Sequence, residues 1–125
     1  MSKYFMVMLG AALGGLARYV AGSVVFGRYS SRFPLGTVLV NITGCFLIGI
    51  LMSRFMERGD PNPTLRLFLV TGILGGYTTF SSFAWESFEA IDKDRAWVGL
   101  VNILISVIGG YAAVWLGALL SRSLK

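Results

Sequence analysis

The chain has 125 residues, a formal net charge of +5 and a pI of about 9.8, and 55% of its residues are hydrophobic while only 14% are charged. A soluble domain of this size could not cover so much apolar surface with so few charges, so the composition predicts a single domain (1–125) embedded in a lipid bilayer. The absence of histidine and the single cysteine exclude imidazole acid–base chemistry, an intrachain disulfide and a thiolate metal cluster.

Long runs that lack charged residues predict an all-α membrane protein with four transmembrane helices. At a rise of about 1.5 Å per residue, about 20 residues cross the hydrocarbon of a bilayer. Loops between the helices are indicated by Gly59–Pro63 and by Asp92–Arg95, which are rich in turn-forming or charged residues. The expected spans are residues 3–26, 35–56, 65–93 and 96–121.

The first span combines small residues with one charge. Gly10 and Gly14 are four residues apart, a spacing that lets another helix approach closely in lipid. Arg18 is the only charge well inside a span. Three interpretations of it are open: it extends to the membrane surface, it pairs within the protein, or it supplies positive potential at the entry of an ion path.

The second span carries Thr37 and Asn41, which lie four residues apart and therefore on one helical face. Burying an amide or a hydroxyl in hydrocarbon is costly unless the group finds a partner or water. Two interpretations are open. These side chains either bond to another helix, or they belong to a line of donors along a narrow hydrated path for an anion.

The third span contains the run Thr71-Gly-Ile-Leu-Gly75-Gly76-Tyr77-Thr78-Thr79 followed by Phe80-Ser81-Ser82-Phe83. Glycine and β-branched threonine form helices poorly, so we expect this helix to break near its middle. The carbonyls freed by a break can face a hard cation, or serine and threonine hydroxyls can satisfy the backbone instead. The Phe80 and Phe83 rings share a helical face, where they face lipid, pack in a core or present their positive edges to an anion.

The fourth span repeats the polar pattern with Asn102 and Ser106, again four residues apart, and the same two interpretations apply. Four spans place both termini on one side of the membrane, and the eleven basic residues then divide almost evenly between the two sides. The charge bias that normally sets orientation is therefore weak. Either details elsewhere set one orientation, or the chain inserts both ways and two opposed copies form the unit. The scattered basic residues also lead us to expect no nucleic-acid partner.

Three segments together resemble the Fluc (CrcB-type) fluoride channel family, namely residues 10–19, 36–49 and 72–83. The third is the most specific, since a glycine pair followed by Thr-Thr-Phe-Ser-x-Phe has little reason to recur in another four-span protein. Length and span number agree over the whole chain. Ser82 departs from the more usual threonine, and the positions of Asn102 and Ser106 vary within the family.

The resemblance implies a dual-topology, antiparallel homodimer with two pores in the cell (inner) membrane. It implies passive, selective export of fluoride that relieves fluoride toxicity. It also implies a structural Na⁺ held at the break by the backbone carbonyls of Gly75 and Thr78, and an aqueous vestibule near Arg18. The implied fluoride pathway consists of Asn41, Phe80, Phe83, Thr37, Ser81, Asn102 and Ser106.

Two other classes of membrane protein fit the sequence less well. A small multidrug resistance-type exporter also has four spans and dual topology, but it needs a membrane-embedded carboxylate, and the only candidate, Glu86, lies near a span end. A membrane assembly protein that packs through glycine faces would transport nothing and leaves the Thr-Thr-Phe-Ser run unexplained. The sequence contains no convincing nucleophile–base or metal constellation, so we expect no enzyme.

Overall fold

The computed structural model describes residues 3–28, 33–57, 59 and 62–124. These residues form four helical spans, each long and apolar enough to cross a membrane. The ends of the spans differ by no more than two residues from the predicted boundaries, which confirms the all-α, four-span prediction. The spans are α1 (Lys3–Arg28), α2 (Leu35–Glu57), a third made of α3 (Pro63–Arg66), η1 (Leu67–Leu74), α4 (Gly75–Tyr77) and α5 (Phe80–Asp92), and a fourth made of α6 (Ala96–Leu104), η2 (Ile105–Gly109) and α7 (Gly110–Ser123).

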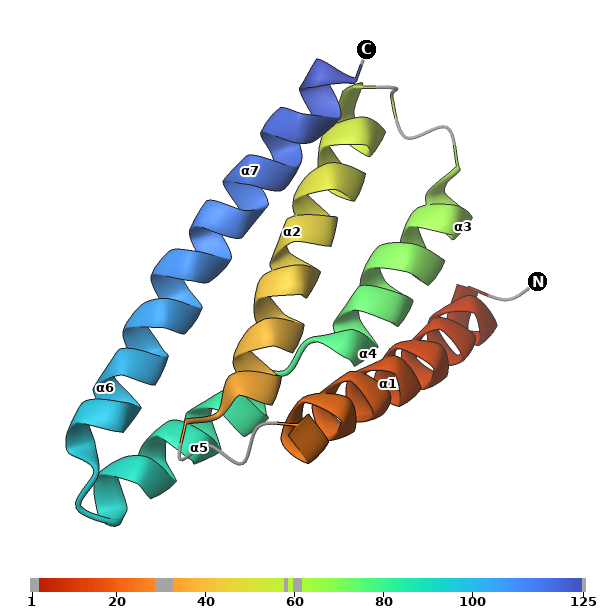
Figure 1. Cartoon of the computed structure of the whole chain (residues 1–125). Coiled ribbons are helices and arrows are strands. Elements are labelled where there is room, and N and C mark those ends of the chain that lie inside the picture. Colours follow the sequence, from red (N-terminus) through yellow and green to blue (C-terminus); the bar gives the residue numbers. More distant parts are fainter. Residues whose placement is uncertain (1–2, 29–32, 58, 60–61, 125) are drawn as a thin grey trace.

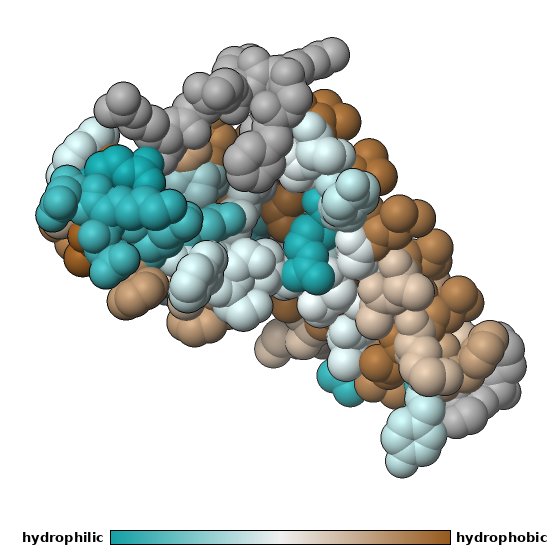
Figure 2. All heavy atoms as spheres, turned by 90° about the horizontal axis from the view of Figure 1, so that it is seen from below, coloured by the Kyte–Doolittle hydropathy of each residue, from teal (hydrophilic) through white to brown (hydrophobic). Residues whose placement is uncertain are grey.

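The spans pair in a way that leaves the break of the third span near the centre of the molecule (Figure 1). α1 runs beside η1 and α4, whereas α2 runs beside α7, and α5 bends away to pack against α6. Seen from below in Figure 2, hydrophilic side chains gather at the left, at the corner between α5 and α6, while mostly hydrophobic ones cover α1 at the right.

Glycines allow α1 to approach the third span closely. A Cβ atom on Gly10 would meet the Phe68 carbonyl and the Cα of Gly72, and one on Gly14 would overlap the carbonyl of Ile73. Lipid tails are as apolar as the helices, so association depends on this backbone proximity rather than on a hydrophobic force. The predicted close packing at Gly10 and Gly14 is therefore confirmed.

Gly14→Ala is expected to lower the stability of the protein by about 1–3 kcal/mol, since the new methyl would force α1 away from the Ile73 carbonyl. Gly15→Ala is the matched control, because a Cβ at Gly15 would have nothing within 4 Å. Thermal unfolding in detergent measures both. Equal melting temperatures for the two variants would contradict the close contact.

A second seam joins α2 to α7. A Cβ on Gly49 would overlap the Val114 carbonyl, and one on Gly117 would overlap the Phe46 carbonyl. Two serine hydroxyls, of Ser53 in α2 and Ser121 in α7, are buried without a hydrogen-bond partner among the described residues. This half of the bundle is thus held by close helix packing rather than by hydrogen bonds between those serines and the neighbouring helix.

The corner between α5 and α6 closes with a left-handed residue. Asp94 has a φ of 55°, and the N–H of Arg95 donates to the Ala90 carbonyl at 2.9 Å, the arrangement of a Schellman helix end. Glycine adopts this conformation readily, whereas in other residues it costs free energy because Cβ is crowded by the backbone.

Asp94→Gly is therefore expected to raise the stability by about 0.5–1 kcal/mol, while Asp94→Val should lower it by more than that amount. Chemical unfolding of the two variants beside the wild type gives the comparison. A destabilised glycine variant would mean that the aspartate side chain contributes more than its backbone conformation costs.

Candidate functional site

The third span breaks at two threonines. Thr78 (φ −81°, ψ 157°) and Thr79 (φ −148°, ψ 115°) are extended, and they separate α4 from α5. The predicted break is confirmed, and its position is now exact: Gly75 and Gly76 remain helical, and the helix ends after them. β-Branched threonine tolerates the extended conformation well, whereas the freed backbone groups need partners from other helices.

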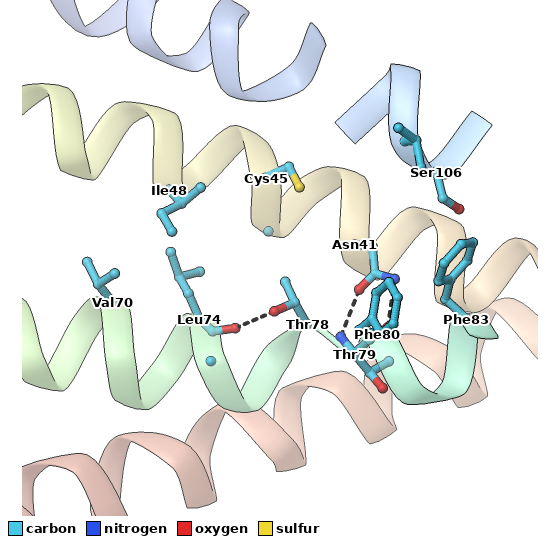
Figure 3. A pocket seen from close by; sticks show the side chains of 13 residues that line it. Asn41, Cys45, Ile48, Val70, Leu74, Thr78, Thr79, Phe80, Phe83 and Ser106 are labelled. Carbon is cyan, nitrogen blue, oxygen red and sulfur yellow. Dashed lines mark hydrogen bonds between the residues drawn. The ribbon is translucent and has the colours of Figure 1, made fainter. Parts of the chain in front are cut away.

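Asn41 of α2 supplies two of those partners. Its Nδ2 donates to the Thr79 carbonyl at 2.9 Å, and its Oδ1 accepts from the Thr79 N–H at 2.8 Å (Figure 3). A side-chain amide suits this position because it carries a donor and an acceptor side by side. Of the two interpretations of Asn41, bonding to another helix is what the structure shows. The second hydrogen on Nδ2 is left over by this pairing and can be donated elsewhere.

Thr79 also starts α5. Its hydroxyl accepts from the Ser82 N–H at 3.2 Å and donates to the Ser82 hydroxyl at 3.0 Å. The cap places the positive end of the α5 dipole near the middle of the span. Thr79 was missed as a site residue in the sequence analysis. A signal was present, since a threonine at the start of a helical segment is a preferred cap.

A pocket of about 350 Å³ lies beside the break, between α2, the third span and η2 (Figure 3). Among the thirteen described residues that line it, none carries a charge, and most are apolar. The polar groups that reach it are an amide, hydroxyls and backbone. The predicted site residues that the structure brings together here are Asn41, Gly75, Thr78, Phe80, Phe83 and Ser106.

The two phenylalanines of this pocket differ sharply in burial. Phe80 is 78% exposed, whereas Phe83 is 8% exposed. Their ring centroids are 5.4 Å apart and the rings are tilted by 56°, so they do not stack face to face. Both residues line the larger pocket, and the edge of an aromatic ring carries partial positive charge.

A smaller pocket of about 110 Å³ opens on the other side of Thr79, between α1, α2 and α5. Arg18 and Thr37 line it. The Arg18 guanidinium donates to the Thr78 carbonyl at 3.3 Å, so Arg18 pairs with backbone freed by the break. Thr37 donates its hydroxyl to Oε1 of Glu86 at 2.6 Å. Thr79 lines both pockets and thus stands between them.

Two predicted site residues are not brought to either pocket. Ser81 is exposed, and its hydroxyl is 3.3 Å from that of Thr79. Asn102 is only 1% exposed, because α6 packs against α5 at this level of the bundle. Glu86 joins the site beyond the prediction: its Oε2 is buried without a hydrogen-bond partner among the described residues, beside the bond that Oε1 makes with Thr37.

Four apolar spans with an uncharged, mostly apolar pocket that a few polar groups reach at a helix break define a multi-pass membrane protein with a candidate transport site. Residues 5–118 match the family described as CrcB-like protein, Camphor Resistance (CrcB). The chain belongs to this family, and the resemblance drawn from residues 10–19, 36–49 and 72–83 is confirmed. The location as a multi-pass membrane protein is confirmed with it.

Relatives agree along almost the whole chain. The chain is 53% identical to the fluoride-specific ion channel FluC of Solibacter usitatus over 120 residues, which cover 96% of this chain and 98% of the relative. It is 43% identical to the FluC proteins of Acidobacterium capsulatum and Coxiella burnetii. These alignments cover 92% and 95% of this chain, and 92% and 97% of the relatives.

Proposed function

We propose that this protein is an ion channel selective for fluoride, which lets the ion leave the cell passively and so relieves its toxicity. The observation that carries the proposal is the uncharged pocket at the break, lined by an amide, hydroxyls and aromatic rings, in a chain whose relatives are named fluoride-specific ion channels. Membership of this family decides against the small multidrug resistance-type exporter. The proposal describes conduction, not an enzyme reaction.

The chemistry of the pocket suits a small, strongly hydrated anion. A selective pore must replace the water shell with close hydrogen-bond donors, yet it must release the ion again. Several buried lysine or arginine side chains arranged around the pore would hold fluoride too strongly, whereas neutral groups bind it weakly at several positions. The spare hydrogen of Asn41, the edges of Phe80 and Phe83, and the Ser106 hydroxyl offer such places. Thr37 and Ser81 extend the proposed pathway, and Arg18 supplies positive potential at its vestibule.

The working unit in this proposal is an antiparallel homodimer. The Phe80 ring lines the larger pocket with 78% of its surface exposed in one copy, and a second copy placed against it would complete the wall of the pocket there. The nearly even division of basic residues between the two sides of the membrane is compatible with insertion in both orientations. Labelling one loop residue separately from the outer and the inner side of the cell membrane measures the orientation of the chain. Labelling from a single side would contradict dual topology.

A structural Na⁺ at the break is part of the same proposal. Oxygen ligands suit this hard cation, and the backbone fits at Gly75: the Thr79 N–H, which would continue the helix by bonding the Gly75 carbonyl, donates to Asn41 instead. The Thr78 carbonyl fits less simply, because it already accepts from Arg18. A carbonyl has a second lone pair, so the cation and Arg18 can share it. When bound, the ion would supply positive charge that stabilises the freed carbonyls of two copies.

The test is fluoride efflux from liposomes that contain the purified protein, followed with a fluoride electrode. Liposomes loaded with chloride are the selectivity control, and empty liposomes give the leak. We expect rapid fluoride release and chloride release close to the leak. Fluoride release no faster than from empty liposomes would refute the proposed function, and equal release of both ions would refute its selectivity.

A further inference from the structure

Asn102 is the most completely buried large side chain among the described residues, with 1% of its surface exposed. Its Nδ2 donates to the Ser87 hydroxyl at 2.8 Å, and that hydroxyl donates to the Phe83 carbonyl at 2.8 Å. On its other side, Oδ1 of Asn102 accepts from the Ser106 hydroxyl at 3.4 Å. One amide thus connects residues of two different helices that both line the larger pocket.

We propose that Asn102 is a positioning residue of the conduction pathway. It sets the place of Phe83 through Ser87 and the place of Ser106 directly, and it does not contact the transported ion. The inference rests on the proposed function, and it assigns Asn102 a role different from lining the polar track.

Packing alone does not require an amide at this place. Burying an amide costs free energy unless its hydrogen bonds are made, and an aliphatic side chain of similar size fills the same volume without that cost. Once it is satisfied, such a network holds its members in one arrangement in the low dielectric of the interior. Here the members are the Phe83 backbone, at the start of α5, and the Ser106 hydroxyl, in η2. A fixed distance between these two elements sets the width of the pocket between them.

Two substitutions interrupt this network at different residues. Asn102→Leu removes the amide and leaves the Ser87 hydroxyl bonded to Phe83, while Ser87→Ala removes the link between Asn102 and Phe83. We expect each variant to slow fluoride efflux about tenfold and to lower the ratio of fluoride to chloride release. The double variant should be no slower than the slower single variant, because both changes interrupt one connection.

Ser121→Ala is the matched control. It also removes a buried serine hydroxyl, but from the seam between α2 and α7, and the hydroxyl it removes has no partner among the described residues. We expect it to conduct like the wild type. Efflux is normalised to the amount of folded protein, which gel filtration in detergent measures. If Asn102→Leu fails to fold, the ratio of fluoride to chloride release by Ser87→Ala still tests the positioning role.

The outcomes separate the two proposals. A wild type that releases no fluoride refutes the function itself. If the wild type conducts and the variants melt at lower temperatures but release both ions as the wild type does, the positioning role is overturned. Asn102 is then a packing residue. Additive losses in the double variant also overturn it, since two independent effects would then be at work.

Discussion

Asn41→Asp is expected to abolish fluoride efflux. In the structure, Nδ2 of Asn41 lies 2.9 Å from the Thr79 carbonyl oxygen, and an ionised aspartate would place a second oxygen there without a hydrogen to share. The same carboxylate would repel the passing anion. At an effective dielectric constant of about 20, two such charges about 4 Å apart repel by about 4 kcal/mol, or about three powers of ten in rate.

A second variant separates the two causes. Asn41→Ala removes both bonds to Thr79 but adds no charge, so any flux that it retains and Asn41→Asp lacks measures the electrostatic part. Circular dichroism and gel filtration of both variants report whether the fold and the proposed dimer survive. Fluoride efflux by Asn41→Asp at the wild-type rate would show that Asn41 neither faces the ion nor sets the break.

Phe80→Ile is expected to slow fluoride efflux by up to about tenfold and to leave the proposed dimer intact. Isoleucine keeps an apolar side chain in the pocket but lacks the positive ring edge, and an aromatic contact contributes up to about 1.5 kcal/mol beyond its buried area. The ring is 78% exposed in one copy, so its loss leaves no cavity in the core of that copy. The measurement is again electrode-recorded efflux per amount of reconstituted protein.

Phe88→Ile provides the control for this change. Phe88 lies in the same helix and is 57% exposed, but it packs against Trp85 and does not line the larger pocket. It should conduct at the wild-type rate. If Phe80→Ile does so too, ring edges take no part in conduction, and the pathway depends on amide and hydroxyl groups alone.

The helix break illustrates how far residue types predict structure. Glycine and threonine in the third span predicted a break, because these residues form helices poorly. They could not say which of them would leave the helix. The structure keeps Gly75 and Gly76 helical and extends Thr78 and Thr79, since Asn41 of another span offers both a donor and an acceptor to Thr79. The position of the break therefore depends on a hydrogen-bonding partner that is distant in sequence.

Helical spacing predicted shared faces in the same limited way. Thr37 and Asn41 do lie on one face of α2, but Thr37 opens on the smaller pocket and Asn41 on the larger one, with Thr79 between them. Asn102 and Ser106 share a face too, yet packing of α6 against α5 buries the first, while the second reaches the larger pocket. Residue spacing predicts on which face of a helix a side chain lies. The helices packed against that face decide whether the side chain is buried or lines a pocket.

By itself the sequence determined the four spans, their ends and the family, because charge-free length and an unusual run of residues are local properties. Only the tertiary structure decided which polar groups bond to one another and which remain open to an ion. Hydrogen bonds in a bilayer are made between helices far apart in the chain, so their partners follow from packing that no local pattern contains.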